Sequence, residues 1–412
     1  MRVLHTSDWH LGRTLEGRSR LPEQEQFLTE LCGICSSEKV DMVLVAGDVF
    51  DGSNPPAKAE ELYYDALERL CDGGSRAVVV IAGNHDSPDR IRAANPLAVK
   101  HGISLVGYPG DDLGPGGPIG SARRVRAGQG WLEVHCPTCD QTAFIVTLAY
   151  PSESRLNEVI GESLTDNGRQ AAYSDRVAEL LNGRLAFARD DTVRLVVGHL
   201  FAFGCKESDS ERQIQLGGAL AVRPEAFDPG IGYVALGHLH RPQAVSGSPV
   251  PCRYSGSPLS YSFSESDHQK EVLLVDLAKD GQVAVTPIGL TSGKPLKRWT
   301  PKNLEEALRW CADARNLNCW VDMELVRDQP LTVSEISTLR AAHPGLVNIR
   351  LRSSAQTPIQ EEKRISELPL VDRFRLFCQR NGTEPDQPLL DLFLELVNQE
   401  GKEGAEVEAS RA

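Results

Sequence analysis

Short β-branched runs and helical stretches alternate along the first part of the chain. Apolar runs at residues 2–6, 42–46 and 77–81 have the length and composition of buried strands. Between them, residues 23–36 and 58–70 repeat apolar side chains at helical spacing. Strands that alternate with helices are typical of a mostly parallel sheet covered by helices. The pattern therefore predicts an α/β fold for this part of the chain.

The pattern changes after a Gly- and Pro-rich loop at residues 107–120. Residues 131–135 and 142–148 predict the two strands of a hairpin, and residues 174–182 predict part of a helix. From residue 233 to residue 288 the apolar runs are all strand-like. We therefore expect the second half of this large domain to be rich in β-structure.

Two linker-like segments divide the rest of the chain. A short segment that begins at Thr291 ends the large domain, residues 1–290. The polar residues 353–363 form a second linker after a compact α/β unit, residues 291–352. Residues 364–412 then contain two helical stretches and a polar tail. We therefore expect a large domain, a small α/β domain, a linker and a helical C-terminal segment.

The two C-terminal helical stretches, residues 370–380 and 389–399, carry more apolar surface than they can bury against each other. In the first, Leu370, Phe374 and Phe377 recur at i, i+4 and i+7, and the second is apolar nearly all round. Exposed apolar faces of this kind normally mark a docking site. We expect a partner protein there, and the alternative is that both helices fold back onto the small α/β domain.

The composition is that of an ordinary globular protein. The 412 residues carry a net charge of −13 and 41% are hydrophobic, which excludes a disordered, collagen-like or coiled-coil chain. No apolar run approaches the roughly 18 residues of a membrane-spanning helix, and the N-terminus does not resemble a signal peptide. Ten cysteines without a secretory segment indicate reduced thiols. We therefore expect a cytoplasmic protein.

The acidic net charge limits how the chain could bind nucleic acid. Residues 291–412 carry 17 basic and 19 acidic side chains, so a net charge of −11 falls on residues 1–290. A protein that holds phosphates by bulk charge needs an excess of Lys and Arg. If nucleic acid is the substrate, metal ions or a partner must supply the positive charge.

Candidate chemistry is concentrated in five short segments, each of which follows a predicted strand. Asp8 and His10, and likewise His238 and His240, are spaced i, i+2, which places each pair on one face of an extended segment. Side chains at strand ends share one rim of a sheet, where α/β folds place their sites. The candidate metal ligands in these segments are Asp8, His10, Asp48, Asn84, His199, His238 and His240.

These candidate ligands form a mixed nitrogen and oxygen set. Carboxylates, an amide and imidazoles together suit Mn²⁺, Fe²⁺ or Zn²⁺, whereas an all-oxygen set would favour Mg²⁺ or Ca²⁺. The set exceeds the need of one ion, but two ions that share Asp48 as a bridge would use it and leave positions for water and substrate. Each motif alone is more often a turn with a structural histidine. Five of them in order predict a dinuclear metal centre.

The ordered set resembles the signature of the calcineurin-like metallophosphoesterases. The segments 237–243, 208–212, 254–258 and 262–265 are also similar to the SbcD family of bacterial nuclease subunits. The resemblance implies a layered β-sandwich flanked by helices, with a capping domain and a C-terminal pair of partner-binding helices. It further implies an exonuclease on duplex ends and an endonuclease on single strands or hairpins. Such an enzyme works with an SbcC-type ATPase in DNA repair, recombination and replication, as a homodimer within a heterotetramer.

The same resemblance implies a role for each candidate residue. Asp8, His10, Asp48 and His240 would hold one divalent ion, and Asp48, Asn84, His199 and His238 the other, with Mn²⁺ as the expected metal. His85 would contact the scissile phosphate and help the leaving oxygen depart, and Asp86 would orient the ring of His85. Asp51 stands where some relatives carry a further histidine, so a second imidazole at the phosphate is absent.

Other readings of the sequence stay open. A phosphoesterase that acts on small esters or cyclic nucleotides would not need the small domain or the C-terminal helices. A scaffold that binds metal without turnover is a non-enzymatic alternative. Residues 289–295 do not match a Walker motif, so any ATP dependence must come from another chain. Cys136 and Cys139 could form half of a zinc knuckle, and Trp299 among basic residues could form either a DNA-stacking patch or part of a core.

Helices at residues 58–70 and 90–99 could form a homodimer face, as the family implies. From one sequence they could equally be part of the core.

Overall fold

The computed structural model describes residues 1–152, 155, 166–208, 210–211, 221–278, 281–353, 370–380, 385 and 389–390. Contacts within the chain define two units, Met1–Ser353 and Ser354–Ala412. The second unit contains helix α8 (Leu370–Arg380), as predicted. The predicted linker from residue 354 onward and most of the predicted helix 389–399 lie outside the described residues.

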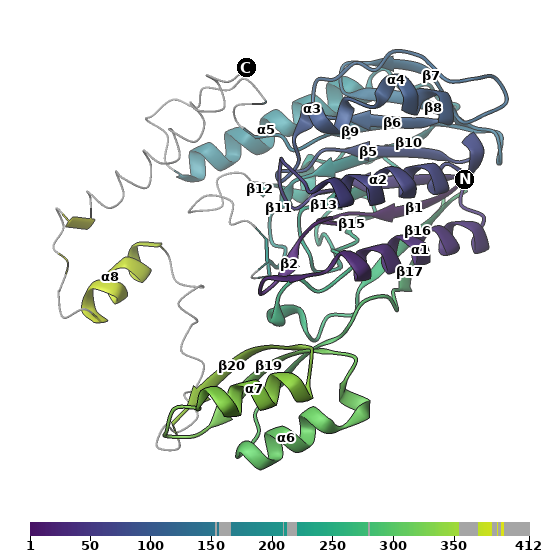
Figure 1. Ribbon diagram of the computed structural model, residues 1–412. Coiled ribbons are helices and arrows are strands. Elements are labelled where there is room, and N and C mark those ends of the chain that lie inside the picture. The colour runs from purple at the N-terminus through teal and green to yellow at the C-terminus, as the bar shows by residue number, and fades with distance from the viewer. Residues whose placement is uncertain are drawn as a thin grey trace. The chain divides into compact units, whose positions relative to one another are not determined.

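A six-stranded sheet forms one half of the large domain in the first unit (Figure 1). Four adjacent strands are parallel, and two strands from later in the chain extend the sheet on one side in antiparallel register. Strands β4 and β5 are buried along their whole length, as expected for apolar strands covered on both faces. In spatial order the strands are β17 (Val283–Gly289), β16 (Glu271–Leu277), β1 (Arg2–Thr6), β4 (Met42–Ala46), β5 (Ala77–Ile81) and β6 (Ile103–Val106).

A seven-stranded sheet forms the other half. Strands β8 and β9 pair as the predicted antiparallel hairpin, and β9, β10, β13 and β15 run parallel. In spatial order the strands are β14 (Gln243–Ala244), β15 (Cys252–Tyr254), β13 (Tyr233–Gly237), β10 (Val193–His199), β9 (Gln141–Leu148), β8 (Trp131–Cys136) and β7 (Arg123–Gly128).

The two sheets pack face to face around one hydrophobic core, which includes Val43 and Val45 from one sheet and Val197 and Ala235 from the other. Helices α1 (Leu21–Ser37) and α2 (Ala57–Leu70) cover the six-stranded sheet, and α5 (Asp166–Leu185) covers the seven-stranded sheet (Figure 1). The predicted α/β class, a layered β-sandwich flanked by helices, is therefore confirmed.

One predicted helix is interrupted. The expected continuous helix at residues 90–99 is instead α3 (Pro88–Arg92) followed by α4 (Asn95–Ala98). The side chain of Asn95 exchanges two hydrogen bonds with the backbone of Leu105. Pro96 has no backbone N–H and so cannot make the hydrogen bond to Arg92 that a continuous helix would need. Together these features fix a break that apolar periodicity does not reveal.

A third, parallel sheet with two helices forms the small α/β domain. Its own core surrounds Trp299 and Met323. Trp320 joins this domain to the large one, because its indole N–H donates to Glu23 Oε1 at 2.8 Å. The elements are β18 (Leu296–Trp299), α6 (Leu304–Ala312), β19 (Trp320–Val326), α7 (Val333–Ala342) and β20 (Leu346–Arg352).

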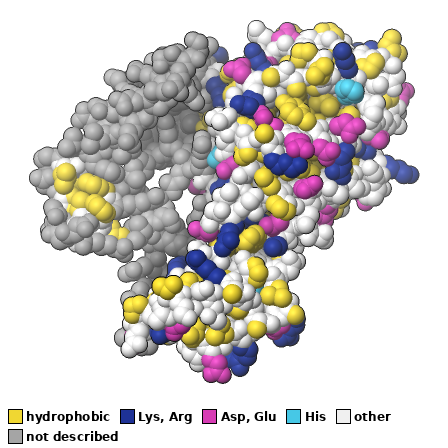
Figure 2. Space-filling view, viewed as in Figure 1, with side chains coloured by type: hydrophobic (Ala, Val, Ile, Leu, Met, Phe, Trp, Pro, Cys, Tyr) yellow, Lys and Arg dark blue, Asp and Glu magenta, His cyan; other side chains and the backbone are white. Residues whose placement is uncertain are grey.

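Short elements complete the described part of the chain. They are strands β2 (Thr14–Leu15), β3 (Arg18–Ser19), β11 (Phe201–Ala202) and β12 (Ala221–Val222), and the 3₁₀ turns Asp72–Gly74, Val99–His101, Pro224–Ala226, Phe263–Glu265 and Ala314–Asn316. On the face drawn in Figure 2, acidic and basic side chains are interspersed. Within the described residues, no helix has the length and apolar character needed to cross a membrane.

Candidate metal centre

The predicted ligands lie at the carboxyl ends of strands from both sheets. Asp8 and Asp48 follow β1 and β4, whereas His199 ends β10 and His238 follows β13. The backbone N–H of His238 donates to Asp8 Oδ1 at 2.9 Å, which joins the two sheets directly. The expectation that all the ligands lie at the rim of a single sheet was therefore wrong. The site lies where the ends of two facing sheets meet.

The loops that carry the ligands are not extended. Asp8, His10, Asp48 and His238 have φ angles of 54°, 46°, 49° and 105°, in the left-handed region that such residues rarely adopt. The argument that i, i+2 spacing places each pair on one face of an extended segment is therefore wrong. Sparsely populated backbone conformations cluster at functional sites, where the surrounding fold holds them.

Two glycines allow neighbouring segments of the site to approach one another closely. A Cβ atom at Gly237 would lie 1.9 Å from the carbonyl oxygen of Ala46, and one at Gly83 would lie 2.1 Å from Asp48 Oδ1. Both distances are far below van der Waals contact. Glycine is therefore required at both positions for the strand ends to meet.

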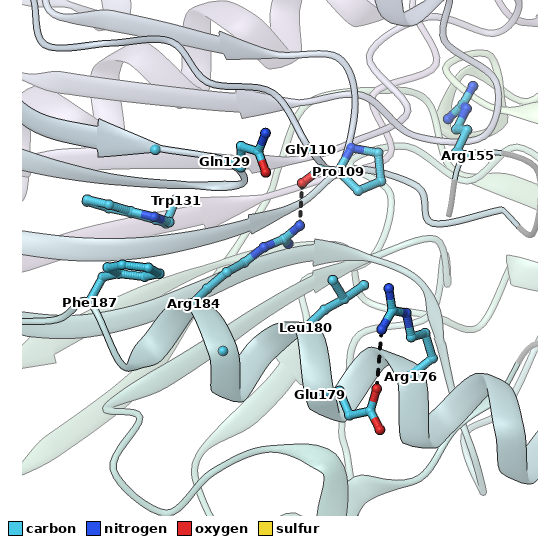
Figure 3. A pocket seen from close by; sticks show the side chains of 12 residues that line it. Pro109, Gly110, Gln129, Trp131, Arg155, Arg176, Glu179, Leu180, Arg184 and Phe187 are labelled. Atoms are coloured by element: carbon cyan, nitrogen blue, oxygen red, sulfur yellow. Dashed lines mark hydrogen bonds and ion pairs between the residues drawn. The ribbon is translucent and has the colours of Figure 1, made fainter. Parts of the chain in front are cut away.

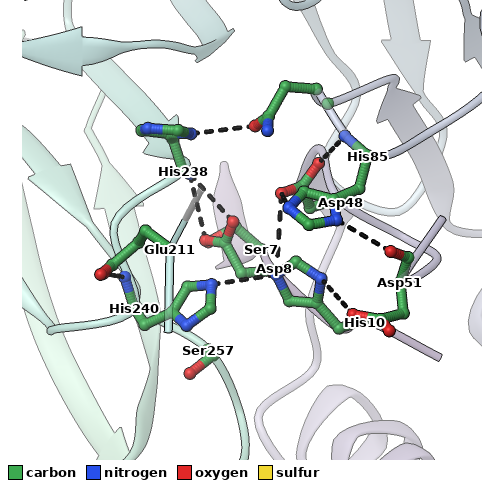
Figure 4. Close-up of polar contacts among 12 residues, drawn as sticks. Ser7, Asp8, His10, Asp48, Asp51, His85, Glu211, His238, His240 and Ser257 are labelled. Atoms are coloured by element: carbon green, nitrogen blue, oxygen red, sulfur yellow. Dashed lines mark hydrogen bonds and ion pairs between the residues drawn. The ribbon is translucent and has the colours of Figure 1, made fainter. Parts of the chain in front are cut away.

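One group of ligand atoms surrounds His10. Asp8, His10 and His240 each offer a ligand atom within 4.8 Å of the others, and all three side chains are buried. The Nε2 atoms of His10 and His240 lie 2.9 Å apart. Two imidazole nitrogens that face each other at this distance fit a shared cation (Figure 4).

A second group of ligand atoms consists of Asp8, Asp48 and His199. His199 Nδ1 lies 2.8 Å from the carbonyl oxygen of Ala46, which holds a proton on Nδ1 and leaves Nε2 as an acceptor. Nε2 of His199 lies 3.5 Å from Asp48 Oδ2 and 2.9 Å from Asn84 Oδ1. Acceptors that converge on one point fit a second cation.

Asn84 connects His199 with the remaining predicted ligand. Its Oδ1 atom lies 3.0 Å from His238 Nδ1 as well as 2.9 Å from His199 Nε2. The structure therefore brings together all seven residues that the sequence suggested as ligands, and their donor types fit a site for divalent metal ions.

Burial and neighbouring charges shape the protonation of this site. Burial raises the pKa of Asp8 to about 6 and lowers the pKa of His238 to about 3. Burial alone would raise the pKa of Asp48, but the imidazoles of His199 and His10 outweigh it and hold that pKa well below its usual range. Burial alone would lower the pKa of His199, but the carboxylate of Asp48 outweighs it and raises that pKa to about 9. A cation that binds His199 would therefore displace a proton from its ring.

His85 lies beside this group. Its ring packs edge-on against His10 at 4.8 Å, and its Nε2 atom lies 4.0 Å from Asp48 Oδ2. Nδ1 lies 2.8 Å from the backbone carbonyl oxygen of Asp51, which orients the ring. The sequence pointed only to the side chain of Asp51, so this contribution of its backbone was missed.

Asp86 has a different position from the one expected. Its carboxylate accepts hydrogen bonds from the backbone N–H groups of Val49, Phe50 and Gly83 at 3.1, 2.9 and 2.9 Å. It therefore ties the loop after β4 to the loop after β5. The geometry does not support Asp86 as the residue that orients the His85 ring.

A buried network behind His240 was also missed. Ser210 Oγ lies 2.5 Å from both His240 Nδ1 and Glu265 Oε1, and Glu265 pairs with Lys270. Glu211 Oε1 accepts from the backbone N–H of His240 at 2.6 Å. These residues belong to, or closely follow, the segments 208–212 and 262–265 that carried the family resemblance. That was the only sequence signal for them.

The structure does not support the possible zinc knuckle or the possible DNA-stacking patch. Within the described part of the chain, Cys136 and Cys139 belong to no group of three metal-ligating residues. Trp299 is only 7% exposed and packs against Trp310 and His343 in the small domain, so it is a core residue.

Comparisons with known proteins agree with this geometry. A family model described as calcineurin-like phosphoesterase matches residues 1–242. The chain therefore belongs to the calcineurin-like phosphoesterase family, and it is a metal-dependent phosphodiesterase.

Within that family the chain resembles one kind of protein over nearly its whole length. It is 42% identical to the SbcD subunit of nuclease SbcCD from Bacillus subtilis strain 168, over 97% of this chain and 98% of that protein. It is 38% identical to the corresponding subunit of Rhodobacter capsulatus, over 72% and 71% of the two chains. It is 29% identical to that of Escherichia coli K12, over 95% and 97%. The resemblance inferred from the sequence is confirmed.

Proposed function

We propose that this chain is the nuclease subunit of an SbcCD-type complex and that it hydrolyses phosphodiester bonds of DNA. It would act as an exonuclease on duplex ends and as an endonuclease on single strands or hairpins, in DNA repair and recombination. The observation that carries the proposal is the convergence of seven ligand-type side chains, with His85 beside them, at the meeting point of two sheets. The match to nuclease subunits over 97% of the chain favours this function over hydrolysis of small esters.

Two of three overlapping groups of ligand atoms support an assignment to two ions, which we propose to be Mn²⁺. These two are Asp8 with His10 and His240, and Asp8 with Asp48 and His199, and the third is His10 with Asp51 and His85. Mixed imidazole and carboxylate ligands suit Mn²⁺ better than Ca²⁺. We assign the first ion to Asp8, His10, Asp48 and His240, and the second to Asp48, Asn84, His199 and His238.

The protein groups divide the chemistry among them. Two bound cations would lower the pKa of a bridging water and offset the charge of the phosphate. Asp48 lies within reach of both ligand groups, because its Oδ2 atom is 3.6 Å from His10 Nε2 and 3.5 Å from His199 Nε2. The carbonyl of Asp51 accepts a hydrogen bond from Nδ1 of His85 and so supports the imidazolium form, in which Nε2 also carries a proton that it can give to the leaving oxygen.

The rest of the chain would serve assembly. We propose that residues 1–290 form the nuclease domain and residues 291–352 a capping domain. Residues 364–412, which follow the linker 353–363, would bind an SbcC-type ATPase. We further propose a cytoplasmic homodimer within a heterotetramer.

A Mn²⁺-dependent assay on three substrates tests the function. Purified chain is given linear duplex DNA, single-stranded DNA or a small phosphate bis-ester, with Asp48→Asn as the inactive control. We expect cleavage of DNA at rates well above those for the bis-ester. Rapid hydrolysis of the bis-ester without cleavage of either DNA would support the small-ester alternative. No hydrolysis of any substrate would support a non-catalytic scaffold.

A further inference from the structure

One cavity of the large domain is lined by none of the proposed metal ligands. It has a volume of about 560 Å³ and is bounded by helix α5 and by the loops that follow β6 and β7. Ligand sites in proteins typically measure roughly 300–1,000 Å³. Figure 3 shows Trp131 and Phe187 at one end of the cavity, Arg155 and Arg176 toward the other, and Arg184 between them.

The described part of the cavity lining is positively charged although the chain is acidic. Among the described residues, Arg155, Arg176 and Arg184 line the cavity together with a single acidic residue, Glu179. The whole chain carries a net charge of −13. A local excess of guanidinium groups on such a chain favours an anionic ligand, and arginine is well suited to phosphate.

Arg184 is the most informative of these residues because it is buried. It is 8% exposed, and its guanidinium group donates to the carbonyl oxygens of Pro109 at 2.7 Å and Thr147 at 3.4 Å. Among the residues that the structure describes, no carboxylate lies within ion-pair distance of it. Burial lowers the pKa of Arg184 to about 10. A buried cation whose partners are neutral would be stabilised by an anion in the cavity.

An aromatic stack closes the other end. The rings of Phe144 and Trp131 lie 5.1 Å apart at 21°, and those of Trp131 and Phe187 lie 5.5 Å apart at 12°. Phe187 ends the stack and is 54% exposed. An exposed phenyl ring that is supported from behind is a suitable platform for a nucleobase.

The arginine end of the cavity adjoins the metal centre. Arg155 Nη1 lies 3.5 Å from the carbonyl oxygen of Gly83, the residue before Asn84. The guanidinium of Arg155 lies 5.6 Å from the ring centre of Tyr150, whose ring lies 6.2 Å from that of His199. A strand held at the metal centre could therefore continue along the arginines toward Phe187.

We propose that this cavity is a subsite for single-stranded DNA, in which the arginines hold backbone phosphates and Phe187 stacks on a base. The inference rests on the proposed nuclease function and specifies a path that the substrate strand takes beside the metal centre. Two independent features support it, namely a buried cation with no acidic partner among the described residues and the exposed end of the aromatic stack.

Binding of a fluorescent (dT)₈ oligonucleotide to the full chain tests the proposal. The measurement is made in EDTA, so that metal-bound phosphate does not contribute. Phe187→Ala should weaken binding roughly tenfold, the effect of losing one stacked base, and Phe187→Tyr should retain it. Arg176→Glu should weaken binding and reduce the slope of log affinity against log salt by about 0.7 for each phosphate that is no longer bound.

Arg309→Glu is the matched control. Arg309 is an exposed helical arginine that pairs with a glutamate three positions away, as Arg176 does, but it lies on α6 in the small domain. Unchanged binding by both Phe187→Ala and Arg176→Glu, an equal loss in Arg309→Glu, or no binding by the unaltered chain would overturn the inference.

A separate measurement distinguishes this outcome from failure of the proposed function. The unaltered chain is assayed for Mn²⁺-dependent hydrolysis of single-stranded DNA. Absence of hydrolysis contradicts the nuclease function itself. Hydrolysis combined with unchanged binding by the two cavity variants contradicts only the subsite.

Discussion

The Nε2 atoms of His10 and His240 lie 2.9 Å apart although 230 positions separate the two residues in the sequence. His10 follows the first strand of one sheet, and His240 follows a strand of the facing sheet. Folding of the whole sandwich is therefore needed to assemble one ion's ligands. Metal binding should in turn stabilise the contact between the sheets.

Substitution of Asp48 tests the shared-ligand assignment. Asp48→Asn should abolish nuclease activity and lower metal content, because a neutral amide is a poor bridge between two cations. Metal content is measured by elemental analysis after dialysis, and activity in saturating Mn²⁺. Near-normal rates in saturating Mn²⁺ would contradict the assignment of Asp48 as the bridge.

Substitution of His85 should separate catalysis from metal binding. His85→Ala should leave metal content unchanged and reduce turnover by roughly 10²- to 10⁴-fold, the range for loss of a general acid or base. The expectation follows from the position of His85, whose ring packs against His10 but whose Nδ1 atom contacts the backbone of Asp51. If metal content falls together with activity, His85 is a ligand and the assignment is wrong.

The network behind His240 should set the affinity for metal. Ser210→Ala removes the partner of His240 Nδ1, and Glu265→Gln removes the charge that fixes Ser210. Loss of such supporting contacts typically costs about 10- to 100-fold in metal affinity. Titration calorimetry with Mn²⁺ measures the effect directly.

Ser264→Ala serves as the control for these two variants. Ser264 lies beside Glu265, but its hydroxyl contacts Ser262 and not the network. Its affinity for Mn²⁺ should equal that of the unaltered chain. If Ser210→Ala and Glu265→Gln bind Mn²⁺ as tightly as the unaltered chain does, the network does not act on His240.

A buried histidine between the sheets should make stability depend on pH. His5 Nδ1 lies 3.0 Å from the hydroxyl of Tyr233, His5 Nε2 lies 3.1 Å from the carbonyl oxygen of Leu236, and burial lowers the pKa of His5 to about 3. In the unfolded chain a histidine titrates near pH 6.5. As the pH falls below about 6.5, the unfolded state therefore takes up a proton that the folded state does not, and stability decreases until the pH reaches about 3.

Comparison with His5→Gln should show this pH dependence of stability, because the amide of glutamine can form hydrogen bonds but does not titrate. Between pH 6.5 and 5, the free energy of unfolding of the unaltered chain should fall more steeply than that of the variant, by up to about 1.4 kcal/mol per pH unit. Urea denaturation in EDTA at several pH values measures both slopes. The exposed His101→Gln is the control and should keep the unaltered slope. If the free energy of unfolding of His5→Gln falls with pH as steeply as that of the unaltered chain, His5 is not the source of the pH dependence.

Local features of the fold could be predicted from the sequence because they depend on neighbouring residues. The β-branched run that forms β5 (Ala77–Ile81) and the apolar periodicity of α7 (Val333–Ala342) are visible within a few residues. The ligand residues could be found for the same reason, since each stands just after, or at the end of, such a run.

Relationships between distant segments could not be predicted in the same way. The contact between His5 and Tyr233 joins residues 228 positions apart, and no local pattern determines which two sheets will face each other. The left-handed backbone of Asp8 also depends on its bond to Gly47 in another loop. The role of Asp86 was mistaken for a related reason, because its neighbour in sequence, His85, is not its partner in space.

Truncation tests whether the C-terminal segment serves as the docking site for the partner. Contacts within the chain place the boundary of the first unit at Ser353, so removal of the residues after Ala355 should leave Met1–Ser353 folded. The truncated chain should retain its metal and cut single-stranded DNA in Mn²⁺. It should not co-purify with the SbcC-type ATPase and should show no ATP-stimulated cleavage of duplex DNA.

A point variant makes the same test without removing a segment. Phe377 on α8 is 63% exposed, and Phe377→Glu places a charge on the apolar stripe that we expect to dock. Val333 on α7 is 85% exposed, so Val333→Glu is a matched control on the small domain that should leave the complex intact. Because a desolvated charge in an apolar interface is strongly unfavourable, Phe377→Glu should reduce co-purification of the ATPase while nuclease activity on single strands persists. If both the truncated chain and Phe377→Glu still form the complex with unchanged affinity, the C-terminal helices are not its main docking site.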